Sequence, residues 1–101
     1  MKNKIIVLDD TGIVKTKEKD KTTYSRHILL KSDKNIYRIS INYDYKDLKC
    51  AKLYILNSDN KLTLITNRDI NDFIKSHEDT VEDIFKNVIE YFQNLIIEMN
   101  K

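Results

Sequence analysis

Residues 24–43, YSRHILLKSDKNIYRISINY, decide the fold of this chain. Segments 24–31 and 36–43 flank the polar run SDKN, and apolar residues alternate with polar ones in both, the period-2 pattern of a half-buried strand. If residues 32–35 form the loop of a hairpin, Lys31 pairs with Ile36 and Ile28 with Ile39. The pattern therefore predicts an antiparallel pair with one buried and one solvated face. The buried face is expected to carry Tyr24, Arg26, Ile28, Leu30, Tyr37, Ile39, Ile41 and Tyr43.

A second hairpin is predicted directly after the first. Residues 51–57 and 62–66 flank the loop SDNK at 58–61, which resembles SDKN in composition. Asparagine takes the role that glycine usually has in such loops, because its side chain tolerates left-handed backbone better than other non-glycine side chains do. The register stays open, since a loop of three residues fits as well as one of four. A slip of one residue exchanges the two faces.

The N-terminal quarter predicts a further strand and a turn. Residues 5–8 are apolar and favour a short buried strand, and residues 9–12 favour a turn with Gly12 in the left-handed position. Residues 13–14 are expected to begin a return strand. Residues 15–23, KTKEKDKTT, lack apolar periodicity and predict an exposed loop or an extension of a hairpin.

From residue 66 onward the apolar period changes to 3.6, which predicts two helices. Thr66 with Asp69 resembles a capping box, so a short helix is expected through residue 76. Ser76 with Asp79 and Thr80 with Asp83 offer two caps for the last helix. The last helix carries a one-sided apolar stripe, as expected for a helix that lies on a sheet. The stripe consists of Val81, Ile84, Phe85, Val88, Ile89, Phe92, Leu95, Ile96 and Met99.

Together these elements predict an α+β fold. We expect a four- to five-stranded antiparallel sheet, mostly a meander, with two C-terminal helices packed on one face. The 101 residues are expected to form a single domain, 1–101, with strands over roughly 4–66 and helices over roughly 67–100.

Composition limits the chemistry and the location of the chain. Phosphate-binding loops and nucleophile elbows need glycines, and the chain has one glycine. Its single cysteine, Cys50, forms no intrachain disulfide and fits a reducing compartment. No apolar run suits a signal peptide or a membrane span, so we expect a cytoplasmic protein without a membrane partner, in the producing or an infected bacterial cell. Isoleucine, lysine and asparagine, which have AT-rich codons, make up 40 of 101 residues and indicate a low-GC genome, such as that of a bacterium, its phage or another mobile element.

The residues that could carry catalysis are scattered. Asp9 and Asp10 follow an apolar strand, as magnesium ligands often do, but no helix pattern follows them and a turn is expected. His27 and His77 lack clustered cysteines, whereas a zinc site usually needs three or four ligands at close spacing. A nucleophile pair of Cys50 and His27 is unsupported, because Cys50 opens a strand and nothing marks an oxyanion hole. We therefore expect no enzyme, no catalytic residue, no metal and no cofactor.

The solvated face of the first hairpin is the predicted binding surface. It is basic and polar, and Lys52 and Tyr54 extend it if the second hairpin takes the shorter loop. Tyr43 and Tyr45, at the end of the second strand of this hairpin, are included among the candidates because tyrosine is enriched at interfaces. Tyr43 also suits the edge of the core. An ordinary solvated sheet face has nearly the same composition. The candidate binding residues are His27, Lys31, Arg38, Ser40, Asn42, Tyr43, Tyr45, Lys52 and Tyr54.

The partner is expected to be another protein. The leading hypothesis is a small protein-binding inhibitor or antagonist encoded by a phage or mobile element, for example an anti-CRISPR or other anti-defence inhibitor. The alternative is a nucleic-acid-binding protein that uses the basic sheet face. Residues 1–50 carry 12 basic and 7 acidic side chains, and residues 51–101 carry 6 and 9, although helix starts also attract acidic residues. A homodimer through the last helix or a sheet edge is a further alternative.

Overall fold

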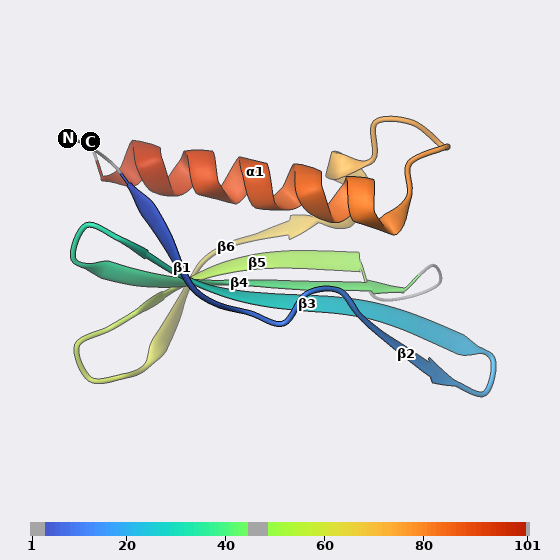
Figure 1. The fold of residues 1–101 in the computed structure, drawn as a ribbon, viewed down its shortest axis with the longest axis horizontal. Helices are drawn as coiled ribbons and strands as arrows, with labels where there is room; N and C mark the ends of the chain where they lie inside the picture. Colours follow the sequence, from blue (N-terminus) through green and yellow to red (C-terminus); the bar gives the residue numbers. More distant parts are fainter. Residues whose placement is uncertain (1–3, 45–48, 101) are drawn as a thin grey trace.

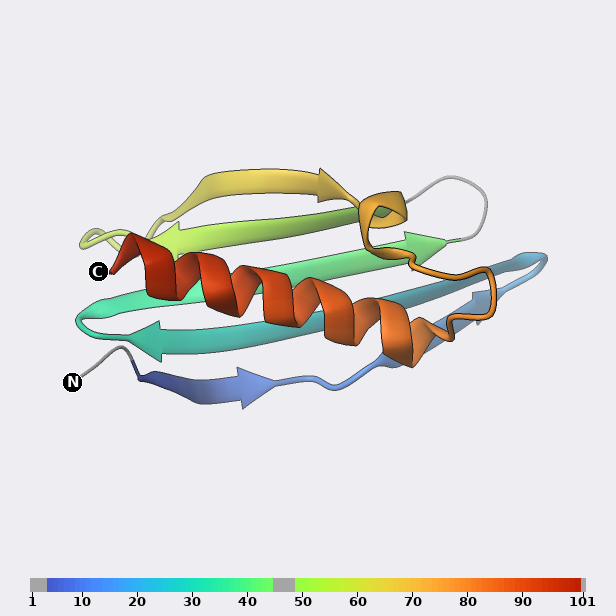
Figure 2. The same cartoon turned by 90° about the horizontal axis from the view of Figure 1, so that it is seen from above.

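An antiparallel sheet with one long α-helix across one face makes up the residues that the computed structural model describes, 4–44 and 49–100 (Figure 1). The described elements are β1 (Ile5–Asp10), β2 (Val14–Glu18), β3 (Lys21–Ser32), β4 (Asn35–Asp44), β5 (Lys49–Leu56), β6 (Leu62–Asp69), the 3₁₀ turn η1 (Ile70–Phe73) and α1 (Val81–Met99). The expected sheet of four to five strands is therefore wrong in number, because the described part has six strands. Seen from above, α1 crosses the middle of the sheet (Figure 2).

The central hairpin forms in the predicted register. Lys31 pairs with Ile36 and Ile28 with Ile39, and Asp33 takes the left-handed conformation at the turn with a φ of 57°. In the second hairpin Asn57 N donates to Lys61 O at 2.8 Å, which closes the shorter of the two expected loops. Strands β3 to β6 are thus a meander, as the alternation predicts.

The predicted turn and return strand at residues 9–14 are wrong. Strands β1 and β2 both pair antiparallel with β3, so the chain continues in one direction along the edge of β3 instead of reversing. Gly12, with a φ of 68°, lies in a kink between the two strands, and Thr11 N still donates to His27 O at 3.1 Å. Residues 15–23 form strand β2, the turn and the start of β3, where Lys19 has a φ of 50°. β3 accommodates both strands because it is twelve residues long.

The predicted helix over residues 66–76 is also wrong, so there is one α-helix in place of two. Thr66 lies within β6 opposite Leu53, and β6 continues to Asp69. Asp69 caps only the single turn η1, where its side chain accepts from Asn71 N at 2.9 Å. The partnership with β5 supplies ladder hydrogen bonds that a local capping pattern does not outweigh, since tertiary pairing overrides local propensity.

The core lies between α1 and the sheet. α1 begins at the second of the two predicted caps, a capping box in which Thr80 Oγ1 accepts from Asp83 N and Asp83 Oδ2 accepts from Thr80 N, each at 3.1 Å. At the other end of α1, Asn100 Nδ2 donates to Ile96 O and contacts Ser32 Oγ beside the β3–β4 turn. The buried residues of α1 are Ile84, Phe85, Val88, Phe92 and Ile96. The apolar stripe is therefore occupied by the sheet of the same chain, and no described element covers the opposite face (Figure 1).

Candidate functional site

The outer face of the sheet is the face turned away from α1, and most of the candidate binding residues lie on it. Strand pairing aligns His27 with Ser40 and Ser40 with Lys52, and it aligns Arg38 with Tyr54. The seven candidates that share the outer face are His27, Lys31, Arg38, Ser40, Asn42, Lys52 and Tyr54. Tyr43 lies on the inner face and is buried in the core, and Tyr45 lies outside the described residues. The common face is confirmed, and the binding role of these residues stays a prediction.

Three basic residues of the outer face form a diagonal line across adjacent strands. Lys31 on β3 lies opposite Ile36, two residues from Arg38 on β4, and Arg38 lies opposite Tyr54, two residues from Lys52 on β5. Diagonal neighbours in an antiparallel sheet are about 7–8 Å apart. Within the described residues, the ion pairs are Lys21–Asp44, Arg26–Asp10 and Arg68–Asp72, so none involves this line. Lys31, Arg38 and Lys52, here called the cationic diagonal, carry positive charge that no described carboxylate neutralises.

An apolar patch borders the cationic diagonal at the end of the sheet that carries the β3–β4 and β5–β6 turns. Leu56 pairs with Leu62 and Tyr54 with Leu64, which places all four on the outer face. Leu62 and Leu64 are 40% and 49% exposed. We call this patch the apolar corner; its members are Ile36, Tyr54, Leu56, Leu62 and Leu64.

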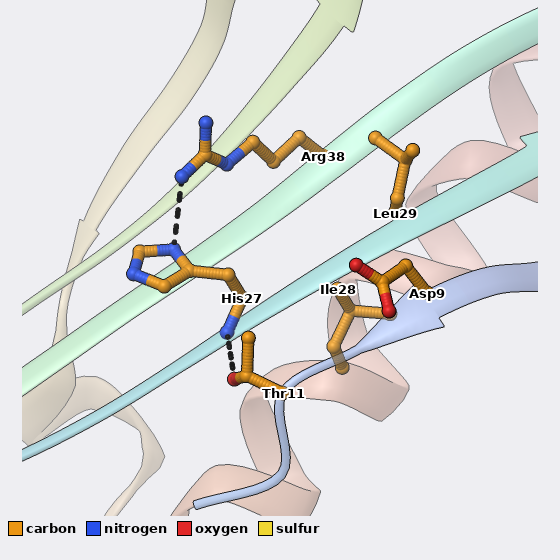
Figure 3. A pocket seen from close by; sticks show the side chains of 6 residues that line it. All are labelled: Asp9, Thr11, His27, Ile28, Leu29 and Arg38. Atoms are coloured by element: carbon orange, nitrogen blue, oxygen red, sulfur yellow. Dashed lines mark hydrogen bonds between the residues drawn. The ribbon is translucent and has the colours of Figure 1, made fainter. Parts of the chain in front are cut away.

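A cavity of about 320 Å³ opens beside the diagonal, where β1 runs along β3 (Figure 3). The register of β1 shifts between Val7 and Asp9, and the kink at Gly12 follows, so the edge strand is irregular at this point. The cavity is lined by Asp9, Thr11, His27, Ile28, Leu29 and Arg38. The carboxylate of Asp9 on β1 and the guanidinium of Arg38 on β4 both line this cavity, with Ile28 and Leu29 of β3 as its apolar lining.

The surroundings of His27 favour the neutral form of its ring. Arg38 Nη2 lies 3.3 Å from His27 Nδ1, and Ser40 Oγ lies 3.0 Å from the same nitrogen. Because a guanidinium only donates, Nδ1 is the acceptor and the ring proton is on Nε2. Burial lowers the pKa of His27 below its ordinary value of 6.5, and the charge of Arg38 lowers it further.

An ion pair on the inner side of the kink holds the cavity wall in place. Arg26 Nε and Nη2 donate to the two carboxylate oxygens of Asp10 at 3.0 and 2.6 Å, and Gly12 N donates to Asp10 Oδ1 at 2.8 Å. The hydrogen bonds from Arg26 lower the pKa of Asp10 below its usual 3.8 despite partial burial. Asp10 therefore stays charged at neutral pH and anchors the chain where it leaves β1.

The polar groups of the cavity are engaged in structural hydrogen bonds. Thr11 Oγ1 donates to Gly12 O at 2.8 Å and accepts from His27 N at 3.0 Å. Its proton is therefore directed at a backbone carbonyl and not at a side chain that could act as a base. The His27 nitrogen that would act as a base, Nδ1, already faces two donors. In the part of the chain described, no group of three or more His, Cys, Asp or Glu could hold a metal ion. The hydroxyl and the imidazole that line the cavity are therefore used in hydrogen bonds within the fold.

A second cavity, of about 380 Å³, lies between β6, η1 and α1. It differs from the first cavity in that its arginine, Arg68, is paired with a carboxylate. Arg68 donates to Tyr91 Oη at 2.6 Å and to Asp72 at 3.3 Å, and its guanidinium lies 4.9 Å from the centre of the Tyr91 ring. Phe73 contacts the same guanidinium at 5.5 Å. Arg68 is thus satisfied by its neighbours and links three elements of the fold, whereas the side chain of Arg38 has a single hydrogen bond among the described residues, to His27.

Sequence reasoning missed the cavity and the apolar corner. The cavity depends on the course of β1 and on a bulge, and a reversing turn at residues 9–12 would have removed it. The apolar corner depends on the register of β5 with β6, which the sequence left open. The alternation of Leu62 and Leu64 did carry a signal, since two leucines at that spacing share one face of a strand.

Comparisons of this chain with protein-family models, curated proteins and solved structures found no match. Among the described residues, no helix combines the length and the apolar character that a membrane span requires. The candidate site on the outer face is described by its geometry alone: the cationic diagonal, the apolar corner and the cavity beside them.

Proposed function

We propose that this chain is a non-enzymatic binding protein whose outer sheet face docks on an acidic surface of another protein. The observation that carries the proposal is the cationic diagonal, which lacks carboxylate partners in the described residues and borders the apolar corner. Protein interfaces combine an apolar centre with a polar rim, and arginine and tyrosine are enriched among their energetically dominant residues. Apolar side chains flanked by carboxylates would complement this surface in both shape and charge.

An inhibitor or antagonist is the form of binding protein that we favour. Such a protein acts by covering a surface of its target, and a sheet face that presents Arg38 and Tyr54 side by side is suited to that task. The abundance of residues with AT-rich codons supports an origin in a low-GC bacterium, its phage or another mobile element, and an anti-defence inhibitor is the concrete example.

A nucleic-acid interface is the second candidate. Tyr54 lies opposite Arg38 and two residues from Lys52, so an aromatic ring is flanked by two cations. Such an arrangement can stack on a base while the cations contact phosphates. The exposed leucines of the apolar corner favour protein over nucleic acid, because they offer nothing to a phosphate backbone.

Charge reversal on the two sides of the molecule tests the proposal. Tagged protein is used to capture partners from bacterial lysate, and the binding of the purified partner is then measured by calorimetry for the wild type, Arg38→Glu and Lys86→Glu. Lys86 is exposed on α1, on the opposite side of the sheet, and serves as the matched control. We expect Arg38→Glu to weaken binding by at least about tenfold and Lys86→Glu to leave it unchanged.

Two results would contradict the proposal. The absence of any stoichiometric partner would contradict a protein partner, and equal binding of the purified partner by all three proteins would contradict docking on the outer face. Fluorescence anisotropy with short labelled single- and double-stranded DNA at low salt addresses the second candidate. Binding that weakens steeply with salt and is lost in Arg38→Glu would favour nucleic acid instead.

A further inference from the structure

Strand β1 leaves an apolar edge of the sheet open. Among the described strands it pairs only with β3 and ends the strand order, along the margin of the sheet in Figure 2. Ile6, Val7 and Leu8 are 50%, 53% and 46% exposed. Backbone N–H and C=O groups on the free side of an edge strand are available for pairing with another strand, and an apolar edge favours such pairing.

The remainder of the same edge is protected by charge. β2 continues along β3 beyond the kink and carries Lys15, Lys17 and Glu18, all exposed. Charged side chains on an edge strand, lysine above all, discourage pairing with another chain. The apolar part of this edge is therefore confined to β1, ahead of the register shift between Val7 and Asp9.

The two ends of β1 carry opposite charges that suit a second copy of the strand. Lys4 precedes β1, and Asp9 lies near its end. Among the described residues neither belongs to an ion pair, and the Asp9 carboxylate accepts only from the Asp10 backbone, at 3.0 Å. In an antiparallel pair of two β1 strands, Lys4 of each copy approaches the end of the other strand that carries Leu8, Asp9 and Asp10.

From this charge complementarity we infer that β1 is the interface of a symmetric homodimer, in which the β1 strands of two copies pair antiparallel. The same surface serves both copies, so a two-fold axis closes the assembly. Residues directly opposite one another in an antiparallel ladder share a face, so the axis is perpendicular to the sheet. The two outer faces then lie on one side of a continuous sheet, and the cavities beside Asp9 lie near the seam.

The inference of a dimer does not depend on the proposed binding role, but dimerisation would change how the outer face binds a partner. Two cationic diagonals on one side would present two identical sites to a partner. A partner with two acidic surfaces at a matching distance would then bind with higher avidity than either site alone provides.

The oligomeric state of the full chain, measured by sedimentation over a range of concentrations, tests the inference. We expect the wild type to dimerise reversibly and Val7→Lys to weaken dimerisation by at least about tenfold, because two lysines then face one another near the axis. Leu64→Lys is the matched control, since Leu64 is 49% exposed on the opposite edge strand β6. It should dimerise like the wild type. Far-UV circular dichroism verifies that both variants fold.

Exchange of the end charges tests the antiparallel pairing itself. Lys4→Glu and Asp9→Lys should each weaken the dimer, and the double variant should recover most of the loss. A wild type that stays monomeric at every concentration, a dimer disrupted by Leu64→Lys and not by Val7→Lys, or a double variant without recovery overturns the inference. Species that grow beyond the dimer with concentration also overturn it, because they indicate head-to-tail pairing of β1 with β6.

Discussion

At the scale of single residues, His27 links the cavity to the stability of the sheet. Its pKa lies below the ordinary 6.5 because of burial and then the charge of Arg38, so the folded protein binds a proton at His27 less readily than the unfolded chain does. The resulting contribution to stability is fully present above the unfolded pKa of 6.5 and is lost as the pH falls through and below it.

The free energy of unfolding, measured with urea between about pH 8 and about pH 5, should therefore fall toward the acidic end. His27→Gln should remove that part of the slope, whereas His77→Gln, at an exposed position outside the cavity, should retain it. Asp10 does not contribute to this slope. Its pKa is lowered, so its effect on the free energy of unfolding is lost only below about pH 3.8. An unchanged slope in His27→Gln contradicts the assignment.

At the scale of elements, the start of α1 depends on a single residue outside the helix. Thr80 Oγ1 accepts from Asp83 N, and Thr80 N donates to Asp83 Oδ2, so two backbone donors at the helix start are satisfied reciprocally. Thr80→Ala should lower the free energy of unfolding by about 1 kcal/mol, measured by urea denaturation. Thr80→Ser keeps the hydroxyl and should retain most of the stability. Equal losses in the two variants would show that the cap is not the cause.

The elements also show which parts of the fold are predictable from the sequence. The register of the β3–β4 hairpin was predictable because alternation in both strands and the need to bury one face agree. The pattern of Thr66 and Asp69 misled because a capping box is a local signal, while β6 is held by β5. Similarly, Gly12 marks a positive φ in the sequence, but whether the chain reverses or only kinks there depends on the distant strand β3.

At the scale of the whole molecule, the candidate surface arises from a two-layer arrangement. One helix covers one side of the sheet, so the outward side of β3, β4 and β5 forms a single open face, on which Ser40 is buried beside His27 (Figure 1). The face of His27, Arg38 and Ser40 followed from the alternation alone. The apolar corner and the cavity did not, because they need the register of β6 and the course of β1, which are long-range properties.

The same arrangement predicts that the β2–β3 end of the sheet opens more easily than the central strand β4. The β2–β3 end extends past the start of α1 in Figure 2, and every residue of β2 is exposed. β4 lies in the interior of the sheet, with Ile39 and Ile41 fully buried beneath α1. Regions with few buried apolar contacts open locally at low free energy, whereas core strands exchange their amide hydrogens only through global unfolding.

Hydrogen exchange measured by NMR should therefore find fast exchange in β2 and the slowest exchange in β4. Ile96→Val removes a buried methylene at the interface of α1 with the sheet and should cost about 1 kcal/mol. The amides of β4 should then exchange about fivefold faster, because their opening follows the global equilibrium. The amides of β2 should keep their rates, since they open without disturbing α1. Equal acceleration in β2 and β4 would mean that the β2–β3 end unfolds only together with the core.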